Sequence, residues 1–405
     1  MKNHRQAVKT NIDPIIVLLF GILIIISSLN TSFNEIYKSI GLLTLLTALI
    51  VMNVGLLVHL LVKKTIPKTY QSILIFSLIL MLMYLIGILT GSFSARSLIV
   101  AFQLLLLINF FIFCSLINWK LTYIKKIAFV ASVYIILSFI WWMATGMQSS
   151  FKAYMGNPNA FGAFTFFLLY FPLLSYIYEQ KKIKKTLWFV ILFLGLILCF
   201  VSMARSIWLS ILVGLIVYML WPIITSTKQK HKRFYLWLII LAFLGTVLYS
   251  KSSTFSKIVE WNQWIYLHTG KTLLSGRDKF WGSLIDAILE RPLWGYGGGA
   301  NLTEIADITI SAHNLYIQVG LQVGIAGLLI FILLLASIWT ISWKGRNNKT
   351  VRLSAAFMIA IIIHQLFEVC LTQNNLTVGL VQWLIIAIGI SFSRSNSSID
   401  IYKES

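Results

Sequence analysis

Two arginines and one histidine stand out because long apolar stretches with few other charges surround them. Arg205 interrupts one apolar run, His313 begins another, and Arg277 lies in the polar segment between them. Arginine binds phosphate oxygens through paired hydrogen bonds, and histidine is the usual general base near neutral pH. These residues predict chemistry on a diphosphate, with arginines stabilising the leaving group and histidine deprotonating an attacking hydroxyl.

A fourth candidate is an acid inside an apolar stretch. Glu368 follows His364 at i, i+4 spacing, which predicts that both side chains share one face of a helix. Ionisable residues inside membrane helices are functional candidates by default, and Arg205 or Arg277 is the expected partner. A structural ion pair that ties two helices together is the alternative.

Other polar and aromatic residues near these four are candidates for substrate binding. Asn157 and Asn159 flank a proline ahead of an apolar run, where asparagine side chains can cap a helix. The remaining candidates are Trp281, Arg291, Tyr296 and Asn314. No outward-facing acidic pair or Cys/His cluster has metal-ligand spacing, so neither a metal nor another cofactor is predicted.

The elements that must position these residues are membrane helices. The chain of 405 residues is 59% hydrophobic and 11% charged, too apolar for a soluble domain of this size. Apolar runs of roughly 20 residues, the length that crosses a bilayer core, recur about twelve times. The sequence therefore predicts an all-α polytopic membrane protein, with residues 1–405 in a single membrane domain. The predicted spans are 14–30, 39–62, 70–91, 97–118, 124–144, 160–178, 186–203, 205–222, 234–250, 314–341, 352–371 and 376–393.

The net charge of +21 is distributed in a way that indicates topology. Lysines and arginines gather in alternate connections, all on the side of an N-terminus that carries Lys2, Arg5 and Lys9. The basic connections are 63–68, 120–126, 181–185, 228–233 and 344–352. By the positive-inside rule, this multi-pass protein has both termini on the cytoplasmic side of the cell membrane. The basic residues are expected to meet anionic lipid headgroups, and no nucleic acid.

On this topology, residues 251–313 form a large extracytoplasmic loop. Residues 277–290 have the periodicity of an amphipathic helix, which predicts an interfacial helix along the outer membrane surface. Trp261, Trp264 and Tyr266 predict an aromatic belt at the interface. Gly324 and Gly327, downstream of His313, predict close helix packing.

The same residues carry a resemblance to a known family. The segment His313-Asn314-x9-Gly324-x-x-Gly327 resembles the signature of the O-antigen ligase and polymerase superfamily of bacterial membrane glycosyltransferases. Also similar are Ser-Gly-Arg277 with Trp281, the segment Pro292-Leu293-Trp294-Gly295-Tyr296-Gly297, Arg205 at a hairpin turn, and Asn157-Pro158-Asn159. The resemblance covers roughly the second half of the chain and the Asn-Pro-Asn turn.

The resemblance implies a reaction and a role for each candidate. Family members move a glycan from undecaprenyl diphosphate to an acceptor sugar hydroxyl on the outer face of the cytoplasmic membrane, without a metal and with inversion. Carried over, Arg205 and Arg277 would bind the diphosphate, His313 would be the base, and Glu368 would be the acid found in a late span. The implied architecture is a helical bundle related to the lipid-dependent (GT-C-like) glycosyltransferases.

The implied partners are the lipid-linked glycan donor, a glycan acceptor and membrane lipid, with a chain-length regulator or a flippase as a further partner. A polymerase and a ligase both fit the motif. Two other classes remain as alternatives: a secondary transporter, and a non-catalytic scaffold for envelope assembly. Transporters bind near the membrane midplane between repeated halves, whereas the ionisable groups here cluster at the outer ends of spans, which favours an enzyme.

Overall fold

The computed structural model describes residues 13–63, 66–90, 94–269, 272, 274–300, 302–306, 308 and 311–394, so Lys2, Arg5 and Lys9 lie outside the described residues. Within the described ranges, eleven helical segments are long and apolar enough to cross a membrane. They are α1 (Pro14–Ser27), α2 (Glu35–Lys63), α3 (Gln71–Thr90), α4 (Ala95–Leu116), α5 (Leu121–Ala144), α6 (Pro158–Leu168) with α7 (Tyr170–Tyr178), α8 (Lys182–Val201), α9 (Arg205–Ile224), α10 (Lys228–Ser250), α14 (Leu315–Ser342) and α16 (Leu376–Arg394). The predicted polytopic, all-helical fold is confirmed.

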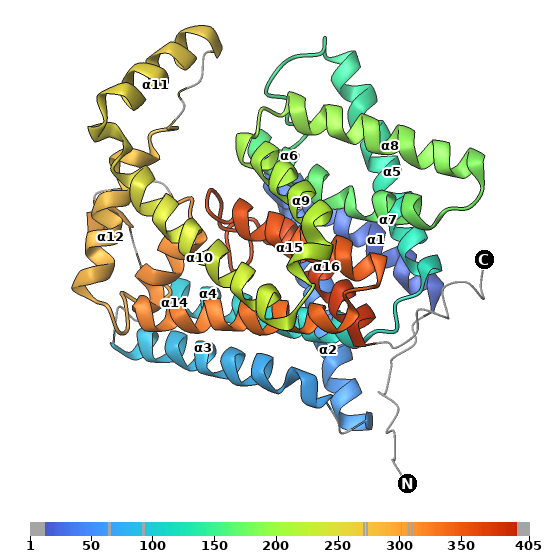
Figure 1. Cartoon of the computed structure of the whole chain (residues 1–405), viewed down its shortest axis with the longest axis horizontal. Coiled ribbons are helices and arrows are strands. Elements are labelled where there is room, and N and C mark those ends of the chain that lie inside the picture. The colour runs from blue at the N-terminus through green and yellow to red at the C-terminus, as the bar shows by residue number, and fades with distance from the viewer. Residues whose placement is uncertain are drawn as a thin grey trace.

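The described residues also form five short 3₁₀ helices and four further α-helices: α11 (Ser256–Thr269), α12 (Trp281–Glu290), α13 (Leu302–Ala306) and α15 (Lys349–His364). Helices α15 and α16 lie in the middle of the bundle, while α11 and α12 both lie on the left in the view of Figure 1, with α11 above α12. The apolar stretch of α16 is entirely buried, whereas those of α8 and α10 are mostly exposed. Because exposed apolar helices are stable only in hydrocarbon, the outer helices face lipid.

The segments that connect consecutive helices lie at the two ends of the bundle, and hydrogen bonds show which of them lie at the same end. At the basic end, the Glu179 carboxylate accepts a hydrogen bond from Lys125 at 2.9 Å, and Trp221 Nε1 donates to the Arg346 carbonyl at 2.8 Å. At the opposite end, the Gly156 N–H donates to the Thr31 carbonyl at 2.7 Å. The predicted alternation of basic and weakly charged connections is therefore present in the fold.

Helix α15 is shorter than the predicted span 352–371. Its 16 residues cover about 24 Å at 1.5 Å per residue, less than the roughly 30 Å of a bilayer core. The chain then continues as buried irregular backbone, in which the Gln365 side chain accepts hydrogen bonds from the N–H groups of Cys370 (2.9 Å) and Leu371 (3.2 Å). The prediction that His364 and Glu368 share a helix face is wrong, because the helix ends at His364.

Two other predicted spans are interrupted. The span 160–178 divides at Leu169 into α6 and α7, and α14 leaves helical geometry at Val323 and Gly324. At the break in α14, Gly324 has φ +71°, and the loop after α12 docks there: Tyr296 N–H donates to the Leu321 carbonyl at 2.7 Å. A Cβ on Gly324 would lie 2.5 Å from the Pro292 carbonyl oxygen. Because Gly324 has no side chain, the backbone of this loop packs against α14 here, where close packing of a helix was predicted.

The segment predicted as one interfacial helix over 277–290 differs in two ways. Its first residues form a short 3₁₀ turn, and α12 begins only at Trp281. Its apolar face packs on protein: Trp281, Leu284 and Ile288 are buried in a cluster that includes Leu321 of α14. Most of the apolar face therefore packs on protein, and the position of this helix along the membrane surface stays a prediction. In contrast, the side chains predicted as an aromatic belt, Trp261, Trp264 and Tyr266, are 67%, 62% and 52% exposed on α11.

We predict that Gly324→Ala destabilises the protein, because a side chain at this φ is strained by about 1–3 kcal/mol and its Cβ would clash with the docked loop. Gly282→Ala is the matched control: it lies in α12, where no heavy atom lies within 4 Å of the added Cβ. Thermal unfolding of both purified variants in detergent tests this. A midpoint for Gly324→Ala equal to that of wild type would contradict the role given to the loop.

Candidate functional site

A cavity of about 910 Å³ opens at the end of the bundle opposite the basic end. We call it the arginine cavity, because Arg205 and Arg277 line it together with His313, Asn157 and Asn159. These side chains come from the starts of α6 and α9 and from the two ends of the segment between α11 and α14. The structure therefore brings together five of the residues selected from the sequence.

The carboxylate of Glu368 connects three of these side chains. Its Oε2 lies 3.3 Å from His313 Nδ1, and its Oε1 lies 3.7 Å from Arg277 Nη2. Oε1 also accepts a hydrogen bond of 3.4 Å from Asn159 Nδ2. Of the two partners expected for Glu368, the structure selects Arg277. Because the carboxylate accepts a hydrogen bond from Nδ1, the Nε2 atom of a neutral His313 is left as the proton acceptor.

The backbone around His313 is held in an unusual conformation. His313 has φ +46°, in the left-handed region that a residue with a side chain rarely adopts. On one side, Trp281 Nε1 donates to the Ala312 carbonyl at 2.9 Å, and on the other, the Leu315 N–H donates to the Gln365 carbonyl at 2.9 Å. Strain of this kind persists where surrounding contacts fix it, and it is typical of functional sites.

Arg205 occupies the first position of α9, at the hairpin predicted from the sequence. Its Nη1 donates to the Thr272 carbonyl at 2.6 Å and its Nη2 to Ser275 Oγ at 2.7 Å, so the guanidinium is fixed to the segment that carries Arg277. Ser275 also has a positive φ, of +56°. The turn before Arg277 is thus shaped by its contact with Arg205.

The contacts of the site favour an ionised Glu368, because Arg277 Nη2 lies 3.7 Å from one carboxylate oxygen and His313 Nδ1 lies 3.3 Å from the other. The Glu368 side chain is 18% exposed, and that of Arg277 is 14% exposed. At neutral pH the site therefore contains a carboxylate that orients the histidine.

Four predicted binding residues do not line the arginine cavity: Arg291, Tyr296, Trp281 and Asn314. Arg291 is exposed, and its guanidinium carbon lies 4.5 Å from the centre of the Tyr296 ring, outside the arginine cavity. Trp281 is 1% exposed, so it supports Ala312 and does not face the cavity. Asn314 is fully buried and caps α14, where Oδ1 accepts from Tyr316 N–H at 2.9 Å. Asn157 caps α6 as predicted, accepting from the Asn159 N–H at 2.8 Å.

Sequence reasoning did not select two aromatic residues that line the arginine cavity, Tyr249 and Phe367. Tyr249, near the end of α10, donates a hydrogen bond to the Leu274 carbonyl, and its ring contacts Trp281. The Arg277 guanidinium carbon lies 5.9 Å from the centre of the Phe367 ring. Aromatic residues at the ends of spans are so common in membrane proteins that no sequence signal distinguishes these two.

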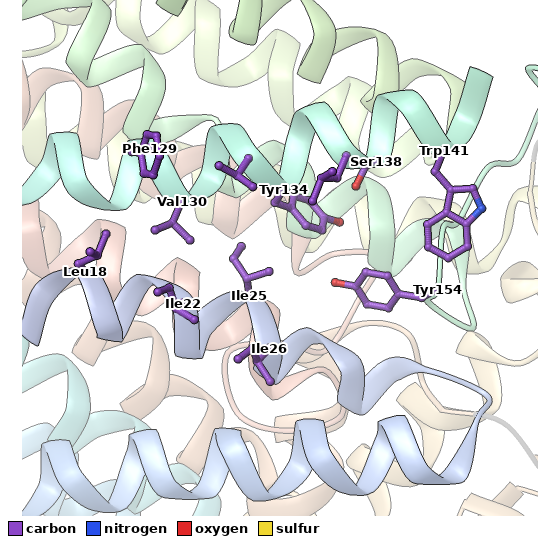
Figure 2. Close-up of a pocket in the computed structure, with 12 residues that line it drawn as sticks. Leu18, Ile22, Ile25, Ile26, Phe129, Val130, Tyr134, Ser138, Trp141 and Tyr154 are labelled. Atoms are coloured by element: carbon purple, nitrogen blue, oxygen red, sulfur yellow. The ribbon is translucent and has the colours of Figure 1, made fainter. Parts of the chain in front are cut away.

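A separate groove of about 550 Å³ lies between α1 and α5. Apolar side chains such as Leu18, Ile22 and Phe129 project into it from the two helices, and Tyr134 and Tyr154 lie toward one end (Figure 2). Among the described residues no charged side chain lines this groove, and its hydroxyl groups, on Tyr134, Ser138 and Tyr154, have no arginine or lysine beside them. The chemistry of the described residues is concentrated at the arginine cavity.

The fold and the site define a polytopic helical membrane protein with a histidine–carboxylate pair and two arginines at one end of the bundle. Residues 189–332, which include Arg205, Arg277 and His313, match a family model described as O-Antigen ligase. The chain is also similar to the ComP-specific O-oligosaccharyltransferase of Acinetobacter baylyi (strain ATCC 33305 / BD413 / ADP1), with 23% identity over 345 residues. That match covers 78% of this chain and 61% of the relative. The predicted resemblance to the O-antigen ligase superfamily is confirmed.

We predict that inorganic pyrophosphate binds in the arginine cavity and protects the purified protein against thermal unfolding. Arg205→Ala and Arg277→Ala should each weaken binding by roughly 10- to 100-fold, because each removes charge-assisted hydrogen bonds worth about 1.5–3 kcal/mol. Arg291→Ala is the matched control, since this arginine is exposed outside the cavity. Equal weakening by all three variants would show that the cavity has no anion site of its own.

Proposed function

We propose that this protein is a metal-independent, inverting glycosyltransferase of the cell membrane. It transfers a glycan from undecaprenyl diphosphate to a sugar hydroxyl of an acceptor on the outer face. The observation that carries the proposal is the pairing of His313 Nδ1 with Glu368 Oε2, at 3.3 Å, beside two arginines in one cavity. The family match and the relative, whose name describes an O-oligosaccharyltransferase, support transfer of a glycan.

The proposed reaction is a single displacement. His313 Nε2 takes the proton of the acceptor hydroxyl as the hydroxyl oxygen forms a bond to the anomeric carbon. The bond between that carbon and the diphosphate oxygen breaks, and the lipid diphosphate leaves with the electron pair. Glu368 stabilises the imidazolium that forms, as the carboxylate does in other His–carboxylate pairs. A retaining mechanism needs a carboxylate nucleophile, and the one acid lining the described cavities is engaged with His313.

The arginines support the departure of the diphosphate. Charge develops on the leaving oxygen, and preorganised cations near that oxygen lower the barrier more than they stabilise the bound substrate. Arg205 is held by Thr272 and Ser275, so little of its freedom is lost when a diphosphate binds. Apolar Leu209 of α9 and Leu248 of α10 line the same cavity, which suits a ligand with a lipid tail and an anionic head.

The orientation of the protein supports an outer-face reaction. The connections rich in lysine and arginine gather at the end of the bundle opposite the arginine cavity, and such connections face the cytoplasm in membrane proteins. The proposed donor is therefore presented after it reaches the outer leaflet, which makes a flippase the upstream partner. Polymerase and ligase remain as the two forms of the reaction, because no described feature selects the acceptor.

We predict that His313→Ala, Arg277→Ala and Glu368→Gln each abolish glycan output while the protein still accumulates in the membrane. Loss of a general base alone slows catalysis by about 100- to 10,000-fold. The measurement is the size distribution of lipid-linked saccharides beside the surface polymer. Single repeats on the lipid indicate a polymerase, and long lipid-linked chains that never reach an anchor indicate a ligase.

The matched controls are His268→Ala and Arg291→Ala, which remove an exposed histidine and an exposed arginine outside the arginine cavity. Both should retain the output of the wild type. Normal glycan output from a well-expressed His313→Ala protein would contradict the assigned base, and a transporter or a scaffold would then fit better.

We predict that cysteines introduced at the two ends of the bundle differ in their accessibility from outside the cell. Ser253→Cys, at the cavity end, should react with a membrane-impermeant maleimide in intact cells, whereas Asn347→Cys, at the basic end, should react only after permeabilisation. The native cysteines, Cys114, Cys199 and Cys370, are all buried and should give a low background. The reverse labelling pattern would place the cavity in the cytoplasm and exclude the proposed outer-face reaction.

A further inference from the structure

A second, smaller cavity of about 240 Å³ adjoins the arginine cavity. We call it the asparagine cavity, because asparagines dominate its polar lining. Those lining residues are Asn30, Asn157, Asn159, Asn374 and Asn375, with Thr31. Asn157 and Asn159 line both cavities, so the two spaces share one wall at the start of α6. Glu368 stands at this wall: it lines the asparagine cavity, while its Oε2 contacts His313 of the arginine cavity.

The lining of the asparagine cavity selects against an anion and in favour of a neutral polar ligand. Glu368 is the one ionised side chain among the described lining residues, and neither arginine nor lysine is present. Side-chain amides both donate and accept hydrogen bonds, and the Thr31 hydroxyl does the same. A ligand that carries several hydroxyl groups meets this lining best, because each hydroxyl is also both a donor and an acceptor.

Two buried polar atoms of the lining residues lack partners among the described residues. His364 is fully buried, and its Nδ1 lies 3.3 Å from Gln382 Nε2 and 3.4 Å from Gln365 Nε2, two amide donors. Nδ1 is therefore the acceptor, and Nε2 carries the hydrogen; this donor has no hydrogen-bond partner. Asn30 Oδ1, an acceptor, is likewise without one. Unpaired buried polar groups destabilise a protein, and a bound hydroxyl would offset that cost by pairing with both of these atoms.

We propose that the asparagine cavity binds one uncharged sugar residue of the substrates of the reaction proposed above. This proposal rests on the proposed function for the reaction that the sugar undergoes. The class of ligand is inferred from the residues that line the cavity. Its volume, about a quarter of that of the arginine cavity, suits a single ring better than a longer glycan. The sugar is either the acceptor residue or the first residue of the donor glycan, and both would reach the shared wall at Glu368.

The test uses the purified full chain in lipid nanodiscs and saturation-transfer difference NMR. The probes are the methyl glycosides of glucose, galactose and N-acetylglucosamine, each added alone and then with saturating inorganic pyrophosphate. At least one glycoside should bind, and pyrophosphate should not displace it, because the anion occupies the arginine cavity. Arg205→Ala should retain the glycoside signal, since Arg205 lines only the arginine cavity.

Asn30→Leu should weaken glycoside binding by roughly tenfold or more, because it removes a buried acceptor and fills the space with an apolar side chain. Its pyrophosphate affinity should stay within about twofold of wild type. Ala160→Leu, which narrows the same cavity, is a second variant in case Asn30→Leu does not fold. Asn347→Leu is the matched control, because Asn347 is exposed at the basic end.

Three outcomes would overturn the proposal: no glycoside binds the wild type, binding survives both cavity-filling variants, or binding is lost in Arg205→Ala. If a glycoside binds but His313→Ala leaves glycan output normal, the sugar site is supported and the proposed reaction is rejected. Incubation with lipid-linked donor separates the two sources. A glycoside that gains a glycan marks the acceptor subsite, and one that inhibits transfer without being modified marks the donor subsite.

Discussion

The Glu368 carboxylate, with its side chain 18% exposed, is the constraint on which the described site depends. A buried charge is expensive unless it is paired and hydrogen-bonded. Its three partners come from distant parts of the chain: Asn159 at the start of α6, Arg277 ahead of α12, and His313 ahead of α14. Because one carboxylate contacts all three side chains, it holds three segments in position relative to one another. These are the segments that line the arginine cavity.

Glu368 lies beyond the end of α15, although its N–H still donates to the His364 carbonyl, one turn back, at 3.1 Å. The chain that follows is irregular, and its buried N–H groups need other acceptors. Gln365 supplies them through its side chain to Cys370 and Leu371, and its own carbonyl accepts from Leu315 N–H. The same residue thus ends α15 and anchors the start of α14 beside His313.

The predicted and observed elements differ where contacts between residues far apart in the sequence decide the structure. Span positions follow from apolar length, and the grouping of Arg205, Arg277 and His313 follows from charges that an apolar chain places at one end of its helices. The end of α15 could not be predicted, because its sequence contains neither glycine nor proline at that point and Gln365 acts through tertiary contacts. Gly324 was recognised as a site of close approach, but the approaching group is the loop after α12, which no pattern within α14 reveals.

Arg291 and Arg277 show why charge and position in the sequence do not by themselves select a site residue. Both lie in the long segment between α11 and α14, but Arg291 stacks on Tyr296 at the surface, while the Arg277 guanidinium lies 3.7 Å from Glu368 and 5.9 Å from the centre of the Phe367 ring. Since neither contact is a close hydrogen bond, most of the guanidinium donors remain available to an anion in the cavity. An anion bound there would offset the charge of Arg277, and Glu368 would then act more strongly on His313. In the proposed reaction, donor binding would in this way strengthen the base before the acceptor hydroxyl is deprotonated.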